Sequence, residues 1–559
     1  MPATRDKQAD LLFAQLEEGI LERDQHATRK TLLDLLYVGQ APVEILSETI
    51  RAHAPYTNVP YHQRVDGGVL RFVNNDHCLL SSRTCLHLPR YLPTELQHLP
   101  LAQTLWYVPT GLDPWNQLIG RMPGHYGRRT YKPVVGVEPP PPERHWEDQE
   151  PLHIEGTFEE GLNEWLTLVE RGEVIKAYRV FLGLFENTQR REELLAQLVF
   201  AGLIDVQGRL LHNRSYTTGH KAYRARATIE LGQAIGWGNA HHVLYAGVLD
   251  VAVGPRWHSE YEMACQVELY RLREELPGSS IDPTPAATRD GELFANQEAL
   301  SEPEAEGLIR ALTTSPEPDY IEHLVALLLA GRGPRQILDT IQIAAANVIL
   351  ETVLPDDFSM PQHAYEYTNT LRWFYDNFSH PHRTKLLFVA GSFVNQAARW
   401  IANLKGHGRP IVSPPKGYDS LSGKQLLARL DNSLMSLEKE ASVAWTQAYL
   451  DAGFGRSPLL HTLTTAAVKH GNDPHNQEIG LCLAEDYGHS TSTQRDTLLL
   501  ASAWNTAGHR KYGDSLESFQ RFAKAIGQSA DGKSGDGVDP EEAVLDQIEQ
   551  LPEPAPPDR

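Results

Sequence analysis

The sequence predicts an all-α protein in which stacked helical hairpins form a large helical bundle, with minor β-structure in the N-terminal block. Helix-length apolar periodicity runs through most of the chain, whereas strand-like alternation appears only at residues 67–75 and 129–137. In addition, residues 35–46 and 327–338 share a helix–Gly–turn–Pro–helix pattern, in which Gly ends one helix and Pro opens the next.

Two segments rich in Pro and Gly divide the 559 residues into blocks. Residues 135–151 contain four consecutive prolines and predict a stiff linker, and residues 276–301 predict a linker or long loop. The predicted units are an N-terminal, mostly helical block of unknown role (1–134), helical block A (152–275), helical block B (302–526) and a disordered acidic tail (527–559).

Within block B, apolar periodicity of helical length marks individual helices. Pro334 is expected to open one of them, directly after a Gly that ends its predecessor. The predicted helices cover residues 321–331, 334–354, 422–450 and 497–513.

Charge and composition exclude several classes of protein. The chain has 51 Lys and Arg against 72 Asp and Glu, a formal charge of −21, and such an acidic chain without basic clusters is a poor nucleic-acid binder. No apolar run approaches the roughly 20 residues of a membrane-spanning helix, and the N-terminus lacks an apolar signal core. With only 4 cysteines, the sequence predicts a cytoplasmic protein of undetermined oligomeric state, without nucleic-acid or membrane partners.

Motifs for common cofactors are absent from the sequence. There is no G-x-G-x-x-G after a strand, P-loop, G-x-S-x-G or HExxH motif, so neither a flavin nor a nicotinamide domain of standard type is expected. His77, Cys78, Cys85 and His87 lie close together in sequence, but they match neither a complete Rieske ligand set nor paired zinc spacing. We interpret them as structural residues with buried thiols.

Three histidines are placed where helices are expected to begin. His220 opens one predicted helix, Pro361 opens another with His363 in its first turn, and Pro474 opens a third. His475 and Glu478 are then at i and i+3 on one helix face, a spacing that bundle metal sites use. Three histidines and a carboxylate suit iron with open coordination positions. The alternative is that such pairs are solvent-exposed and arise by chance.

These three segments resemble the questin oxidase-like family and the related helical domain found beside Rieske domains in some bacterial proteins. The resemblance covers roughly residues 155–515 and rests on GHKAYRARATIELGQAIGWGNAHHVLY, QHAYEYTNTLRW and GNDPHNQEIGLCL. It implies an all-helical non-heme iron oxygenase that opens or oxidises polycyclic aromatic ketones such as anthraquinones. It also implies that iron is held by histidines and a carboxylated lysine that lies near the last histidine on one helix.

Carried over residue by residue, the resemblance makes His220, His363 and His475 metal ligands. Glu478 stands where the lysine is expected. It either supplies a carboxylate directly or marks a site that has drifted and binds nothing. The motifs do not place a fourth histidine, for which His461 and His242 are the candidates.

The resulting hypothesis is an Fe(II)-dependent oxygenase that uses O₂ to oxidise an organic substrate of aromatic or polyketide-like character. His461 is the nearest candidate for a general base. Trp106, Tyr107 and Trp115 are candidates to line a pocket for a flat substrate, or else they pack in the core. The alternatives are a non-catalytic helical scaffold or small-molecule binding protein, and a zinc-dependent hydrolase. Convergence of the three histidines on one point would separate an enzyme from a scaffold.

Overall fold

The structure is a computed structural model of the whole chain. It describes residues 7–22, 24–54, 63–66, 69–72, 77–111, 132–133, 149–171, 173–204, 219–252, 293–316, 319–404, 412–470 and 474–508. The predicted acidic tail, most of both predicted linkers and Trp115 lie outside these residues.

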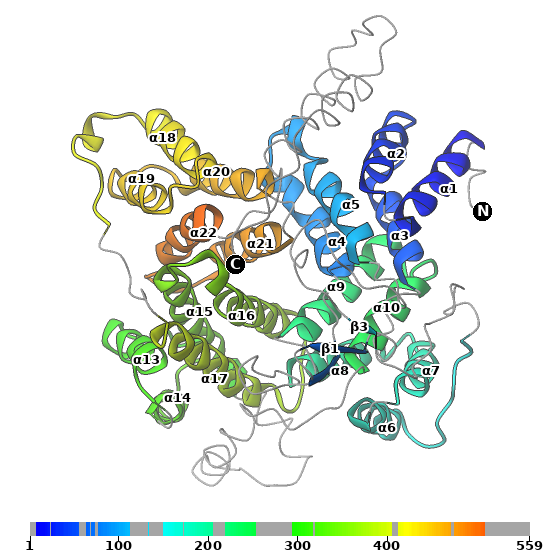
Figure 1. Cartoon of the computed structure of the whole chain (residues 1–559). Helices are drawn as coiled ribbons and strands as arrows, with labels where there is room; N and C mark the ends of the chain where they lie inside the picture. Colours follow the sequence, from blue (N-terminus) through cyan, green and yellow to red (C-terminus); the bar gives the residue numbers. More distant parts are fainter. Residues whose placement is uncertain are drawn as a thin grey trace, which may run out of the picture.

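The described part of the chain is all-α apart from one small sheet, which confirms the predicted fold class (Figure 1). In the N-terminal block the helices are α1 (Lys7–Leu21), α2 (Gln25–Tyr37), α3 (Pro42–His53), α4 (Cys78–His87) and α5 (Leu99–Gly111), with short 3₁₀ turns η3 (Leu88–Tyr91) and η4 (Thr94–Leu96). In block A they are α6 (Phe158–Arg171), α7 (Val174–Phe185), α8 (Arg191–Leu203), α9 (His220–Ile235) and α10 (His241–Ala252).

Block B supplies the remaining described helices. They are α13 (Glu302–Thr314), α14 (Asp319–Leu329), α15 (Pro334–Glu351), α16 (Ser359–Asn377), α17 (Arg383–Ala402), α18 (Gly423–Met435), α19 (Lys439–Asp451), α20 (Arg456–Lys469), α21 (Pro474–His489) and α22 (Asp496–Gly508), with 3₁₀ turns η5 (Pro355–Asp357) and η6 (Tyr418–Ser420). None of the described helices has the combination of length and apolarity that crossing a membrane requires.

The small sheet belongs to the N-terminal block. Its antiparallel strands β1 (Gln63–Asp66), β2 (Val69–Phe72) and β3 (Lys132–Pro133) are arranged in the order β2-β1-β3. β2 and β3 fall within the two segments whose alternation predicts strands.

Both helix–Gly–turn–Pro–helix patterns form the predicted hairpins. Gly39 follows α2 with φ of +80°, and Gly331 follows α14 with φ of +83°, a left-handed conformation that side chains disfavour. Pro42 and Pro334 are the first residues of α3 and α15, where their missing N–H donor is not needed.

The prediction of one helix over residues 422–450 is wrong. The segment forms two helices, α18 and α19, which pack against each other. The chain reverses between them at Leu437, which adopts a left-handed φ of +58° although no Gly or Pro marks the turn. The hairpin buries apolar residues of both halves, such as Leu430 and Tyr449.

Four helices, α4, α9, α16 and α21, form the centre of the molecule (Figure 1). α4 packs against α9 and α21, and α16 packs against the same two helices. Because all residues from Pro474 to Tyr487 of α21 are buried, the helix has no solvent-facing side to display amphipathic periodicity. The four helices come from all three sequence blocks, so the blocks meet at this centre.

The start of α9 is fixed by a close approach to α8. A Cβ atom at Gly202 would lie 2.8 Å from both the Cα and the backbone N of Ala222. We expect Gly202→Ala to lower the free energy of unfolding by about 1–3 kcal/mol, because the backbones must separate. Gly488→Ala is the matched control, since this helical glycine has nothing within 4 Å of its Cβ position. Urea unfolding of both variants measures the difference, and equal effects would contradict the close approach.

Candidate metal centre

Four histidines meet at the centre of the α4, α9, α16 and α21 bundle. His77 is the N-cap of α4, His220 is the first residue of α9, His363 lies near the start of α16, and His475 is the second residue of α21. All four are buried, with at most 5% of any residue exposed. The fold therefore brings the beginnings of four helices, far apart in sequence, to one place.

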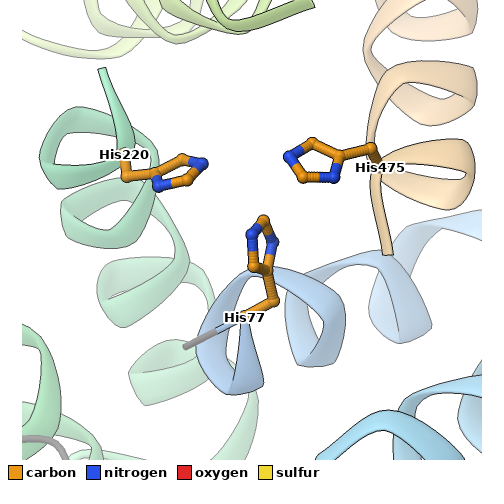
Figure 2. Close-up of side chains that lie close together, drawn as sticks. All are labelled: His77, His220 and His475. Carbon is orange, nitrogen blue, oxygen red and sulfur yellow. The ribbon is translucent and has the colours of Figure 1, made fainter. Parts of the chain in front are cut away.

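The four rings face one another closely. His220 Nε2 lies 2.7 Å from His363 Nε2, which lies 3.4 Å from His475 Nε2. The ring centroid of His77 is 4.9 Å from that of His220 and 4.6 Å from that of His475. Figure 2 shows the rings of His77, His220 and His475 converging on a common volume.

Two sets of three residues have the spacing of metal ligands. In the first, His77, His220 and His475 each offer a donor atom within 4.8 Å of the other two. In the second, His220, His363 and Glu366 do the same. Because both sets contain His220, they adjoin one another.

Hydrogen bonds fix the tautomers of two of the rings. His363 Nδ1 donates to the backbone carbonyl of Ser359 at 2.5 Å, and His77 Nδ1 donates to the carboxylate of Glu478 at 3.0 Å. When neutral, each ring then carries its lone pair on Nε2. Ligating histidines use this arrangement, because the outer N–H bond fixes the orientation of the ring.

His220 is held in its neutral form. Burial lowers its pKa well below the usual value, and the neighbouring His363 and His77 lower it further. Within the described part of the chain, its buried Nδ1 has no hydrogen-bond partner. Neutral imidazole is the form that binds metals.

Two carboxylates flank the histidines, one turn along α16 and α21. Glu366 is 2% exposed, and its Oε1 has no hydrogen-bond partner among the described residues. Burial, and then the nearby Glu478, raise the pKa of Glu366 to about 8. A buried carboxylate oxygen without a hydrogen-bond partner is costly as an anion unless a cation lies close to it, so the donor set fits a metal ion.

A layer of ion pairs lies one to two turns further along the same helices. Arg83 of α4 donates to Tyr223 at 2.8 Å and to Glu485 at 2.9 Å, and pairs with Glu230 at 2.5 Å. Arg226 of α9 donates to Glu485 at 3.0 Å. Burial alone would raise the pKa of Glu485, but Arg226 and Arg83 outweigh it and lower that pKa to about 2.

The layer continues between α16 and α21. Arg372 Nε donates to Asp486 at 2.6 Å, and the hydroxyl of Tyr365 donates to the same carboxylate at 2.9 Å. Asn369 joins the two halves, because it donates to Asp486 at 3.0 Å and accepts from Arg226 at 2.6 Å. These paired charges fix the four helices relative to one another.

The structure brings together all four residues that the sequence predicts as ligands. His220, His363 and His475 converge, and Glu478 reaches the group through its hydrogen bond to His77. The alternative of a solvent-exposed His475 and Glu478 pair is wrong, since these residues are only 2% and 0% exposed.

Neither His77 nor Glu366 is among the ligands predicted from the sequence. The sequence predicts a structural role for His77 beside Cys78 and Cys85, yet the structure places a ring nitrogen of His77 within 4.8 Å of donor atoms of His220 and His475. One sequence signal could have pointed to it: like His220 and His475, it stands at the start of a helix. Glu366 follows His363 at i+3, the spacing that drew attention to Glu478.

The two other candidates for a fourth histidine lie elsewhere. His461 is on α20 with an exposed ring, and its Nδ1 donates to the carbonyl of Tyr91 at 2.7 Å. His242 is on α10, where its Nε2 is 3.1 Å from the hydroxyl of Ser47. Neither belongs to either ligand set. His461 is therefore not placed to act as a base at this centre.

The predicted substrate-binding aromatics are separated by the structure. Tyr107 is buried, and its ring meets the ring of His77 edge-on with centroids 5.8 Å apart. Trp106 turns the other way and packs against α2, with centroids 5.1 Å from His26 and the guanidinium of Arg29 also 5.1 Å from its ring. Trp115 lies outside the described residues.

The thiols of the described cysteines are poor candidates for metal ligands. Cys78, Cys85 and Cys482 are all buried. Burial raises the pKa of Cys85 to about 12 and that of Cys482 well above its usual value. Because a thiol binds a metal as the thiolate, the neighbouring imidazoles and carboxylates are the better donors.

Comparison of the chain with protein-family models, with curated proteins and with solved structures gave no match. The resemblance to the questin oxidase-like family therefore stays a prediction from the sequence.

Proposed function

We propose that this chain is a non-heme iron-dependent oxygenase that oxidises an organic substrate with O₂. One observation carries the proposal: four buried histidines and a buried carboxylate converge from four helices. Burying so many titratable groups costs stability. A non-catalytic scaffold gains nothing from that cost, whereas a metal centre requires it.

The donor set favours iron over zinc. Imidazole nitrogens with a carboxylate oxygen suit iron, and the raised thiol pKa of Cys482 argues against a thiolate site. Catalytic zinc usually has three protein ligands and a water, whereas two adjoining sets of three donors share His220 here. The resemblance stated above points to iron as well.

The residues of the chain would bind the iron, orient the ligating histidines and exclude water. Bound iron supplies the O₂ activation and one-electron chemistry that amino-acid side chains lack. Ser359 and Glu478 orient His363 and His77, and the surrounding helices exclude water from the centre. Tyr107, at the edge of His77, is the nearest of the aromatic residues considered for an aromatic substrate. The cytoplasmic location inferred from the sequence stays part of this proposal.

Turnover of an aromatic substrate tests the proposal. We expect the full-length protein, loaded anaerobically with Fe²⁺ and then exposed to O₂, to consume O₂ faster with members of a panel of anthraquinones and phenols than without them. The zinc-loaded protein is the control and should consume none. Hydrolysis of ester or amide substrates by the zinc form, with no O₂ consumption by the iron form, would overturn the proposal in favour of a hydrolase.

A further inference from the structure

The two carboxylates of the centre occupy matching positions on two helices but have different surroundings. Glu366 follows His363 by three residues on α16, and Glu478 follows His475 by three residues on α21. This spacing places each carboxylate on the same helix face as its histidine. The sequence pattern alone therefore gives no reason to prefer one carboxylate over the other as a ligand.

Glu478 is turned toward the start of α4. Both of its carboxylate oxygens lie within 3.1 Å of His77 Nδ1, and Oε1 also accepts a hydrogen bond from the hydroxyl of Ser81 at 3.1 Å. An oxygen that accepts these bonds has less capacity left for a metal ion. The contacts are instead those of a carboxylate that orients a ligating histidine.

Glu366 has the opposite environment. One of its oxygens lies within 4.8 Å of donor nitrogens of both His220 and His363. Its Oε1 lacks a hydrogen-bond partner among the described residues, although the residue is only 2% exposed. The burial of this oxygen is therefore not compensated by a hydrogen bond from the described protein groups.

We propose that Glu366 is the carboxylate ligand of the metal and that Glu478 is a positioning residue that holds His77 with its Nε2 toward the ion. This division of roles rests on the proposed metal centre. It reverses the expectation from the sequence, which gave the ligand role to Glu478.

The assignment would give the ion a carboxylate donor from α16. Glu366 would bind beside His220 and His363, and His77 and His475 offer further imidazoles next to the shared His220. A carboxylate behind His77 also makes that imidazole a more basic ligand.

Cobalt binding to the full-length protein tests the division without depending on activity. The probe is Co²⁺ alone, which reports affinity by titration and ligand geometry by its visible absorption. We expect Glu366→Ala to weaken Co²⁺ binding by more than about 100-fold and to change or abolish the spectrum. We expect Glu478→Ala to weaken binding by about 10–100-fold, the range for groups that orient a ligand.

The conservative variant separates positioning from ligation. In Glu478→Gln the side-chain oxygen can still accept the proton of His77 Nδ1, so binding should return to within about tenfold of the wild-type value, with the wild-type spectrum. Glu366→Gln should not be rescued, because a neutral amide is a poor substitute for a ligating carboxylate. Circular dichroism of each metal-free variant confirms that the fold is retained.

Two results would overturn the assignment while leaving the metal centre intact. They are a wild-type spectrum in Glu366→Ala, or a Glu478→Gln variant as impaired as Glu478→Ala. Failure of the wild-type protein to bind Co²⁺, Fe²⁺ or Zn²⁺ would instead contradict the proposed function itself, so the two failures are distinguishable.

Discussion

The His363→Ala variant is expected to lose its bound metal. His363 lies between two of the other histidines, since its Nε2 is 2.7 Å from His220 Nε2 and 3.4 Å from His475 Nε2. Its Nδ1 proton is bonded to the carbonyl of Ser359, which leaves Nε2 as the donor atom. Removing a ligand should weaken binding by more than the roughly 10–100-fold caused by removing an orienting group.

Metal content after anaerobic reconstitution with Fe²⁺ and gel filtration measures this effect. The matched control is His323→Ala, which removes an exposed histidine from α14. We expect about one iron per chain in the wild type and the control, and almost none in His363→Ala. Full retention of iron by His363→Ala would show that the metal is held elsewhere.

The second large effect is expected from the buried ion-pair layer. Arg83 is fully buried and compensates the charges of Glu230 and Glu485. Arg83→Met removes the guanidinium and leaves carboxylates in the interior with less compensation. Breaking a buried pair in this way typically lowers the free energy of unfolding by about 3–5 kcal/mol.

Arg90 provides a matched control for the same partner. Its guanidinium lies 3.6 Å from Glu485, but its side chain is 51% exposed. Arg90→Met should therefore cost no more than about 1 kcal/mol, as solvent screens exposed pairs. Urea unfolding at neutral pH compares the two variants, and an equally small effect of Arg83→Met would contradict the account of the layer.

The advantage of wild type over Arg83→Met should also depend on pH. The pKa of Glu485 lies near 2 in the folded protein, below its ordinary value of 4.5. A lowered folded-state pKa contributes stability that is fully present above the ordinary pKa and is lost as pH falls through the folded-state pKa. The difference in unfolding free energy between the two proteins should thus be constant from pH 7 to about pH 5 and shrink toward pH 2. A difference that stays constant throughout would contradict the shift.

The fold class could be predicted because helical periodicity and helix ends are local properties of sequence. Pro334 and Pro474 mark the starts of α15 and α21 whatever packs around them. The turn at Leu437 could not be predicted, since it depends on the antiparallel packing of α18 and α19 rather than on a Gly or Pro at that position.

The site was predictable only in part, for the same reason. His220, His363 and His475 stand at recognisable helix starts, whereas the role of His77 depends on the packing of α4 against α9 and α21. His77 and its partner Glu478 are 401 residues apart in the chain. Glu366 and Glu478 have the same spacing from a histidine, and only their surroundings in the fold distinguish them.

X-ray absorption spectroscopy of the iron-loaded, full-length protein tests the central claim most directly. The account predicts a first shell of nitrogen and oxygen alone at about 2.0–2.2 Å, with outer-shell scattering from about four imidazole rings. A sulfur shell near 2.3 Å, scattering from only one or two imidazoles, or a protein that takes up no iron would contradict it.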